Sequence, residues 1–183
     1  MKLRTVLALS VISCIAILSG CSKSSDPVEE ENDGEMITTI RLKFVNKANA
    51  SDQLIANWRD EDGQGGNPPV IDSVILKPNA QYTMTIDAIL NESVSPASDI
   101  QPEIMQEAEH HLFVFEAAGT GMNIQITDKD KNGLPVGFNS ELSTSVAANG
   151  SLRVILRHQV NTKDGTPGSG SSDIDCSFPV SVR

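Results

Sequence analysis

The chain of 183 residues is poor in aromatic and basic side chains. Aromatic residues make up 4% of it, with one Trp and one Tyr, which argues against an aromatic platform for stacking bases or sugars. Lys and Arg number 14 against 24 Asp and Glu, so the formal net charge is −10. Because phosphate binding needs clustered basic residues, we expect no nucleic-acid partner.

The N-terminal twenty residues have the pattern of a secretory signal. Lys2 and Arg4 precede an apolar run over residues 6–17, which is shorter than the roughly 20 residues that span a membrane. Residues 18–21 (Leu-Ser-Gly-Cys) are similar to the lipobox of bacterial lipoproteins, in which the chain is cut before the cysteine and that cysteine is acylated. We therefore expect residues 1–20 to be a signal peptide and Cys21 to carry the acyl chains, palmitate among them, that anchor the protein.

Cysteine is scarce in the remainder of the chain. Beyond Cys21 there is only Cys176, so no intramolecular disulfide is expected in the mature protein. Residues 22–35 are rich in Ser and acidic residues, and such a segment cannot bury enough apolar surface to become ordered. The sequence thus predicts a lipidated, acidic, disordered tether over residues 21–35 and a domain over residues 36–183.

The predicted domain is a series of short segments in which apolar and polar residues alternate. This period of two predicts half-buried strands. A fully apolar segment at 112–115 predicts a central strand, and Asn149-Gly150 predicts a two-residue hairpin turn. Cys176 lies two residues before Phe178, so on a strand both side chains point to the same apolar face, and we expect Cys176 in the core. The alternating segments lie near residues 36–44, 54–58, 74–76, 82–88, 122–127, 152–156 and 178–182.

Residues 91–110 break this alternation. Ser98 or Asp99 is a candidate cap for a short helix that begins near Ile100, with Pro102 early in the helix, where it is tolerated. Residues 161–173 predict a long mobile loop before the last strand. The fold class predicted is all-β, an antiparallel β-sandwich of Ig-like or jelly-roll-like type, with one short crossing helix.

Several short blocks of the mature sequence carry a family resemblance: residues 35–39 (Glu-Met-Ile-Thr-Thr), 58–63 (Trp-Arg-Asp-Glu-Asp-Gly), 65–68 (Gly-Gly-Asn-Pro), 90–93 (Leu-Asn-Glu-Ser), 107–110 (Glu-Ala-Glu-His), 112–113 (Leu-Phe) and 157–158 (Arg-His). Through these blocks the sequence resembles a family of small lipoproteins from Bacteroidetes, mainly flavobacteria. Members are often described as having a type 1 periplasmic binding fold and are encoded near TonB-dependent receptors of the outer membrane. The resemblance implies a place at the outer membrane and a part in nutrient or metal uptake, whereas the strand pattern favours a β-sandwich over that two-domain α/β fold.

Two acidic loops are candidate calcium sites. Asp128, Asp130 and Asn132 stand at alternate positions before Gly133, as in the first half of a calcium-binding loop, although position 12 is Asn139. The alternative is a polar hairpin turn between the flanking strands. In the second loop, Asp60, Asp62 and Gln64 converge on a cation if the glycines around them allow it, and the alternative is a plain glycine-rich loop.

The histidines offer a second, different metal chemistry. His110, His111 and His158 are all the histidines of the chain, and with Glu107 and Glu109 they are candidate ligands for a transition metal. Adjacent residues on a strand point to opposite faces, so His110 and His111 do not readily share one ion. The alternative is surface histidines at a helix end and a strand end.

The sequence contains no known catalytic motif: it has no nucleophile elbow, no zinc-protease HExxH, no phosphate loop and no CxxC. We therefore expect a non-catalytic, lipid-anchored binding or accessory subunit for a TonB-dependent receptor. The alternative is a calcium-stabilised structural or adhesion module at the cell surface. The sequence leaves open whether the domain faces the periplasm or the cell exterior.

Overall fold

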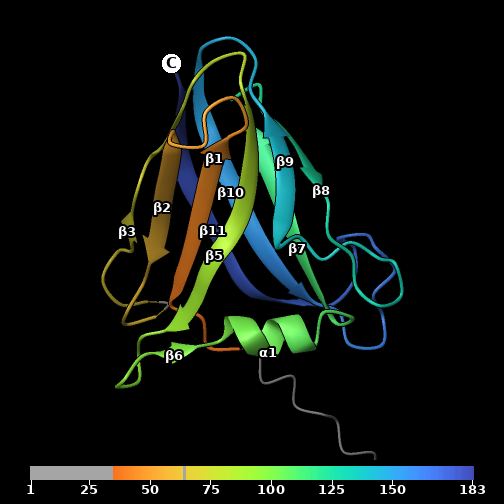
Figure 1. The fold of residues 1–183 in the computed structure, drawn as a ribbon. Helices are drawn as coiled ribbons and strands as arrows, with labels where there is room; N and C mark the ends of the chain where they lie inside the picture. Colours follow the sequence, from red (N-terminus) through yellow and green to blue (C-terminus); the bar gives the residue numbers. More distant parts are fainter. Residues whose placement is uncertain (1–34, 64) are drawn as a thin grey trace, which may run out of the picture. The chain divides into compact units, whose positions relative to one another are not determined.

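Two β-sheets packed in layers form the domain, as the strand pattern predicts (Figure 1). The computed structural model describes residues 35–183 with the exception of residue 64. The predicted signal peptide, Cys21 and the tether up to residue 34 lie outside the described residues.

The larger sheet has seven strands among the described residues, in the order β3-β2-β1-β5-β9-β8 with β6 paired to β5. Its neighbouring strands are antiparallel throughout. The strands are β1 (Thr39–Asn46), β2 (Gln53–Arg59), β3 (Val70–Ile71), β5 (Gln81–Asn91), β6 (Ser98–Asp99), β8 (Asn123–Ile126) and β9 (Asn139–Ser143).

The smaller sheet has four described strands in the order β4-β11-β10-β7. Its two longest strands pair antiparallel, as predicted, whereas the short edge strand β4 pairs with β11 in parallel. The strands are β4 (Val74–Leu76), β7 (His111–Ala118), β10 (Ala148–His158) and β11 (Ser171–Val182).

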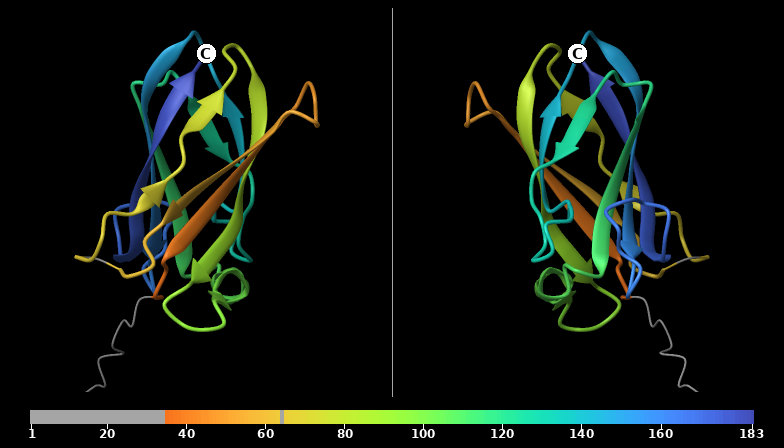
Figure 2. Two further views of the ribbon diagram at one scale, coloured as in Figure 1. Left: turned by 90° about the vertical axis from the view of Figure 1, so that its left-hand side faces the viewer. Right: turned by 90° about the vertical axis from the view of Figure 1, so that its right-hand side faces the viewer.

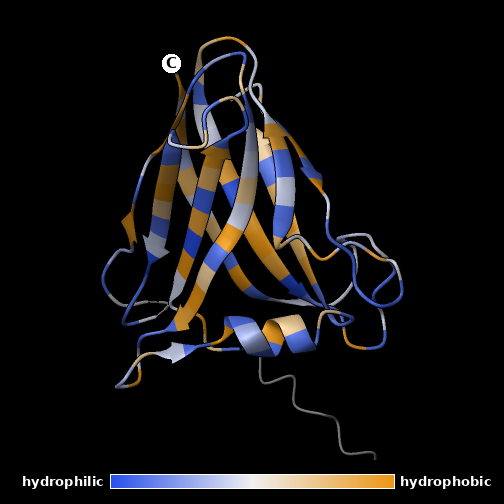
Figure 3. Cartoon of the chain, viewed as in Figure 1, coloured by the Kyte–Doolittle hydropathy of each residue, from blue (hydrophilic) through white to orange (hydrophobic). Residues whose placement is uncertain are grey.

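The core lies between the two sheets. Figure 3 shows hydrophobic and hydrophilic residues alternating along the strands, which gives each sheet one apolar face. Leu42 and Phe44 of one sheet and Phe113 and Phe178 of the other are fully buried. Cys176 is buried as its parity predicts, and burial raises the pKa of its thiol to about 12, so it packs as a small apolar residue.

The one described helix is α1 (Gln101–Gln106), close to the predicted position. Its N-cap is Ile100, and Oδ1 of Asp99 accepts a hydrogen bond from the backbone N–H of Gln101. Ile104 turns into the core, which fixes the helix across one end of the sandwich, away from the C-terminus (Figures 1 and 2). Among the described residues no helix is long and apolar enough to span a membrane.

Two predicted connections differ in the structure. Asn149 and Gly150 form no hairpin turn but lie within β10, paired with Ser181 and Val180. A Cβ at Gly150 would stand 2.0 Å from the carbonyl oxygen of Ala118, so this glycine is required by close approach to β7. The loop predicted over residues 161–173 ends at residue 170, because β11 begins at Ser171. Nε2 of Gln159 donates hydrogen bonds to the carbonyl oxygens of Thr166 and Ser169 within this loop.

The central packing predicts a large stability loss from truncation of Phe178. Phe178→Ala removes a fully buried ring, and we expect it to lower the free energy of unfolding by about 3–5 kcal/mol in chemical denaturation. Ser177→Ala is the matched control, because Ser177 is exposed on the other face of β11, and it should change stability by less than about 0.5 kcal/mol. Equal losses in both variants would contradict the two-layer packing.

Candidate metal centre

Two imidazoles and two carboxylates converge at the end of the sandwich that α1 crosses. Glu35, His111, His158 and Asp173 each offer one ligand atom, and these atoms all lie within 4.8 Å of one another. The side chain of His111 is fully buried, and those of Asp173, Glu35 and His158 are 1%, 10% and 12% exposed. The four residues are far apart in sequence, so the fold alone assembles them.

The two histidines meet because their strands pair. His111 is the first residue of β7 and lies directly opposite His158, the last residue of β10. Phe113 and Leu156, the neighbouring pair two residues further along, are core residues, so both histidines point to the interior face. Their rings stack with centroids 4.6 Å apart and an interplanar angle of 14°.

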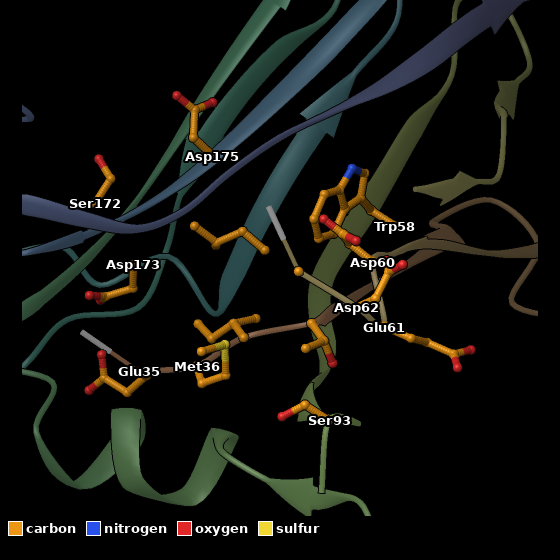
Figure 4. A pocket seen from close by; sticks show the side chains of 14 residues that line it. Glu35, Met36, Trp58, Asp60, Glu61, Asp62, Ser93, Ser172, Asp173 and Asp175 are labelled. Atoms are coloured by element: carbon orange, nitrogen blue, oxygen red, sulfur yellow. The ribbon is translucent and has the colours of Figure 1, made fainter. Parts of the chain in front are cut away.

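Asp173 joins the histidines through a β-bulge in β11. Leu156 pairs with Ile174 but the next residue, Arg157, pairs with Ser172, so Asp173 is an extra residue in its strand. Without the bulge, Asp173 would share the exposed face of Asp175, whose side chain is 43% exposed. A bulge commonly redirects a side chain, and here it turns the Asp173 carboxylate inward (Figure 4).

Glu35 comes from the segment that leads into β1. Thr38 fixes this segment: its N–H donates to the carbonyl of Leu90, and its own carbonyl accepts from the N–H of Asp60. Ile37 is buried, whereas the side chain of Met36 is 60% exposed. Glu35 therefore reaches the cluster from a backbone held less firmly than the three strand residues.

The cluster's ligand atoms lack hydrogen-bond partners. Nε2 of His111 lies 3.2 Å from Oε1 of Glu35 and 3.7 Å from Oδ2 of Asp173, and Nδ1 of His158 lies 3.7 Å from Oδ1 of Asp173. Both Asp173 oxygens, Oε2 of Glu35, Nε2 of His111 and Nδ1 of His158 are buried without a hydrogen-bond partner in the described part of the chain. Buried polar atoms normally have partners, so this concentration of unpartnered nitrogen and oxygen atoms is typical of residues that can hold a cation.

The charges in the cluster are strongly coupled. Burial favours the neutral form of Glu35, but its interaction with His111 outweighs burial and holds the pKa of Glu35 at about 2. Burial and the negative charge of Glu35 raise the pKa of Asp173 to about 7. Burial opposes the charging of both histidines. Glu35 nevertheless raises the pKa of His111, whereas the proximity of His111 further lowers the pKa of His158.

The donor set suits a divalent transition metal. Two imidazole nitrogens and two carboxylate oxygens are ligands typical of Zn²⁺, and tetrahedral coordination places ligand atoms about 3.3 Å apart. The contacts of 3.2 and 3.7 Å are near that spacing. Nδ1 of His111 lies 3.0 Å from the carbonyl oxygen of Glu107, and a proton on Nδ1 leaves the lone pair of Nε2 facing the cluster. The carboxylates together balance the charge of one divalent ion.

A cavity of about 610 Å³ adjoins the cluster on its carboxylate side. Glu35 and Asp173 line it together with Trp58 and residues of the 60–63 segment (Figure 4). Neither His111 nor His158 is among the residues that line it. The cluster therefore meets the cavity through its two carboxylates.

The loop predicted to bind calcium at Asp128, Asp130 and Asn132 forms a turn held by its own carboxylates. Both oxygens of Asp128 accept backbone N–H groups, from Gly137 and Phe138. Oδ2 of Asp130 accepts a hydrogen bond from Nζ of Lys163 at 2.8 Å, in an ion pair whose side chains are almost fully buried. The main-chain and lysine donors already occupy these oxygens, and calcium at this loop stays a prediction.

The second predicted loop lies at the rim of the cavity. Oδ2 of Asp62 accepts hydrogen bonds from the backbone and side-chain nitrogens of Asn67. Asp60 is 9% exposed and its Oδ1 has no hydrogen-bond partner among the described residues. Both residues line the cavity, and Gln64 lies outside the described residues. Calcium at Asp60 and Asp62 also stays a prediction.

Of the predicted transition-metal ligands, the structure brings His111 and His158 together but leaves His110 out of the cluster. Glu107 contributes its backbone carbonyl to His111, and Glu109 pairs with Lys131. The expected partners Glu107 and Glu109 are thus replaced by Glu35 and Asp173. Sequence reasoning missed these two because one lies in the predicted tether and the other in the predicted mobile loop.

Comparisons with protein-family models, with curated proteins and with solved structures yield no match to this chain.

The shifted pKa of Asp173 predicts an unusual pH dependence for the metal-free protein. Between the ordinary value of 3.8 and about 7, the folded state holds a proton that the unfolded state releases. Stability that is present below pH 3.8 is therefore lost as the pH rises toward 7, on the order of a few kcal/mol. Asp173→Asn should flatten this fall when unfolding is measured in EDTA from pH 5 to 8.

Asp175→Asn is the matched control, since Asp175 is two residues away and its pKa is lowered by its hydrogen bonds to Arg153. It should leave the fall in stability from pH 5 to 8 unchanged. A flat profile in the unmodified protein would contradict the burial of an ionisable carboxyl at Asp173.

Proposed function

We propose that this chain binds a divalent transition-metal ion, Zn²⁺ in the first place, at Glu35, His111, His158 and Asp173. The observation that carries the proposal is the convergence of four buried side chains whose ligand atoms have no other partner. An apolar core would accept neither carboxylate without compensation, because an uncompensated buried charge is strongly unfavourable. A bound cation supplies that compensation.

The arrangement supports reversible binding. His111, His158 and Asp173 stand on paired strands, which hold their backbones in place with or without an ion. Glu35 is the adjustable ligand, because its neighbour Met36 is exposed and, among the described residues, the first main-chain hydrogen bond of its segment is that of Thr38. Movement of Glu35 opens the cluster toward the cavity, so the ion has a way in and out.

The fold does not depend on the ion for its core. The buried apolar residues of both sheets form one continuous cluster that includes Phe44, Phe113 and Phe178. Small metal domains that unfold without their ion lack such a core. A folded metal-free state is what a protein needs if it is to take up an ion and give it away.

The proposed role joins this site to the lipoprotein signal. A protein held at the outer membrane through Cys21 would collect the ion near the membrane and present it to a TonB-dependent receptor, as a non-catalytic accessory subunit. The anchor confines the site to the membrane surface and raises its effective concentration near any receptor there. The other role, a metal-stabilised structural module, needs an ion that stays bound.

Zinc titration of residues 22–183 tests the metal site. Protein stripped with EDTA and dialysed should bind one Zn²⁺ per chain in calorimetry. At 100 times the Kd, the ion should add about 2.7 kcal/mol of stability, which raises the Tm by several degrees. Co²⁺ in place of Zn²⁺ should give visible absorption bands typical of nitrogen and oxygen ligands.

His158→Gln and His111→Gln should each abolish the Tm shift, while His110→Ala, the adjacent histidine outside the cluster, should retain it. His158→Gln is the more informative variant if the buried His111 proves necessary for folding. A shift with Ca²⁺ alone would move the site to the acidic loops, and a shift that survives His158→Gln would overturn the assignment. Tight binding without exchange into a chelator would favour the structural role.

Cys21→Ser tests the anchor. We expect the unmodified full chain to incorporate labelled palmitate in cells and to sediment with membranes, and the variant to do neither, because the acylated residue is missing. Cys176→Ser is the matched control, since Cys176 is buried in the core, and it should remain membrane-bound. Labelling of the Cys21 variant would contradict the lipoprotein assignment.

A further inference from the structure

The cavity beside the proposed metal centre has features of an organic ligand site. Its volume of about 610 Å³ lies in the range of small-molecule pockets, and far exceeds the space of a single hydrated ion. Apolar groups of Met36, Ile37, Trp58 and Ile174 contribute to its lining. Figure 4 labels Trp58 and Asp60 among the side chains that line the cavity.

The charged lining of the cavity is entirely acidic among its described residues. Most of these carboxylates already have partners: Glu61 pairs with Arg59 at 2.8 Å, and Asp175 pairs with Arg153 at 2.5 Å. Oδ2 of Asp62 is occupied by Asn67. The lining carboxylates that keep a buried oxygen without a hydrogen-bond partner in the described chain are Asp60 and, at the metal centre, Glu35 and Asp173.

Asp60 is the distinctive group. It is 9% exposed, its Oδ1 has no hydrogen-bond partner within the described residues, and the carboxyl of Asp62 interacts with it. The backbone around it is fixed, because its N–H donates to Thr38 and its carbonyl accepts from Gly63. A buried carboxylate held this way, next to a second one, favours a positively charged partner.

We propose that this cavity binds an organic ammonium ligand, with the charged nitrogen at Asp60 and an apolar body against Trp58. An aromatic face attracts a cation, and carboxylates in the same cavity add Coulombic attraction that is stronger because the site is partly shielded from water. The apolar lining contributes through burial of the ligand's hydrocarbon part. Primary amines and the side chains of lysine-containing peptides belong to this class.

The site is separate from the metal centre although the two share a wall. The ammonium position rests on Asp60 and Trp58, which are no part of the four-residue cluster. Glu35 and Asp173 line the cavity from the other side. The two proposals can therefore be refuted separately. A failure to bind zinc would not contradict the ammonium site, and a failure to bind an ammonium ligand would not contradict the zinc site.

Trp58 gives a direct readout, because it is the only tryptophan of the chain. Residues 22–183, stripped of metal ions with EDTA and then dialysed free of EDTA, are titrated with cyclohexylmethylammonium, with spermidine and with acetyl-Gly-Lys-Gly amide, while Trp fluorescence is followed. The neutral isostere cyclohexylmethanol and Ca²⁺ are titrated in parallel. We expect a saturable fluorescence change with at least one ammonium probe, at a Kd at least ten-fold below that of the neutral alcohol.

Asp60→Asn should raise the Kd of the ammonium probe at least ten-fold and leave the zinc-induced Tm shift unchanged. Oδ1 of Asp60 has no hydrogen-bond partner among the described residues, so we expect the isosteric change to leave folding intact; near-ultraviolet circular dichroism checks this. Glu141→Gln is the matched control for overall charge, because Glu141 is exposed, lies outside the cavity and pairs with Lys47. It should bind the probe like the unmodified protein.

Three results would overturn the proposal. Equal affinity for the ammonium probe and its neutral isostere would show an apolar pocket without charge recognition. A saturable response to Ca²⁺ alone, lost in Asp60→Asn, would make this the inorganic cation site that the sequence predicts. No response of Trp58 to any probe would exclude the cavity as a site for this class of ligand.

Discussion

The burial of two carboxylates in one place is the constraint on which the functional end of this domain depends. Glu35 and Asp173 lie together beneath the sandwich core, and an isolated buried charge is far too unfavourable to persist. Proximity to His111 compensates one carboxylate, and the other keeps a proton to a much higher pH than an exposed aspartate does. This is a costly arrangement for structure alone, because apolar residues of similar size would serve the fold at least as well. A divalent ion removes the cost by replacing the protons.

The fold was largely predictable because its strands carry one apolar face each. The alternation in residues 82–88 and 178–182 leaves only one way to bury the apolar side. β5 and β11 bury these apolar residues as expected except Ala88, which is half-buried because the pairing of β5 with β1 shifts register just before it. The errors occur where backbone proximity outweighs local pattern. Asn149-Gly150 has the composition of a turn, yet Gly150 lies inside β10 because the main chain of β7 leaves no room for a Cβ. No local window of sequence contains that information.

The candidate site was harder to predict for the same reason. His110 stays out of the cluster, but it lies in the turn before β7 rather than on the strand, so the rule for adjacent strand residues is not the reason. That rule also does not supply the partners of His111. His158 becomes a partner through strand register, and Asp173 through one extra residue in β11. Regular alternation along β11 would instead place the side chain of Asp173 on the exposed face, with that of Asp175. The reverse is true of one acidic loop. The spacing of Asp128 and Asp130 in the sequence is typical of calcium ligands, but in the structure their carboxylate oxygens accept hydrogen bonds from main-chain N–H groups and from Lys163.

The shared wall between the metal centre and the cavity has an energetic consequence for both. At a pH above about 7, where Asp173 gives up its proton, its carboxylate and that of Glu35 add negative potential to the cavity, and a divalent ion bound to them would cancel that potential. An organic cation at Asp60 would then be attracted less strongly when the metal is present, and by reciprocity it would weaken the hold on the metal. The effect is modest for groups separated by the width of the cavity, because solvent in the cavity screens the charges. Its sign is nevertheless fixed by the charges of the lining, so the occupant of the cavity would favour release of the ion rather than its retention.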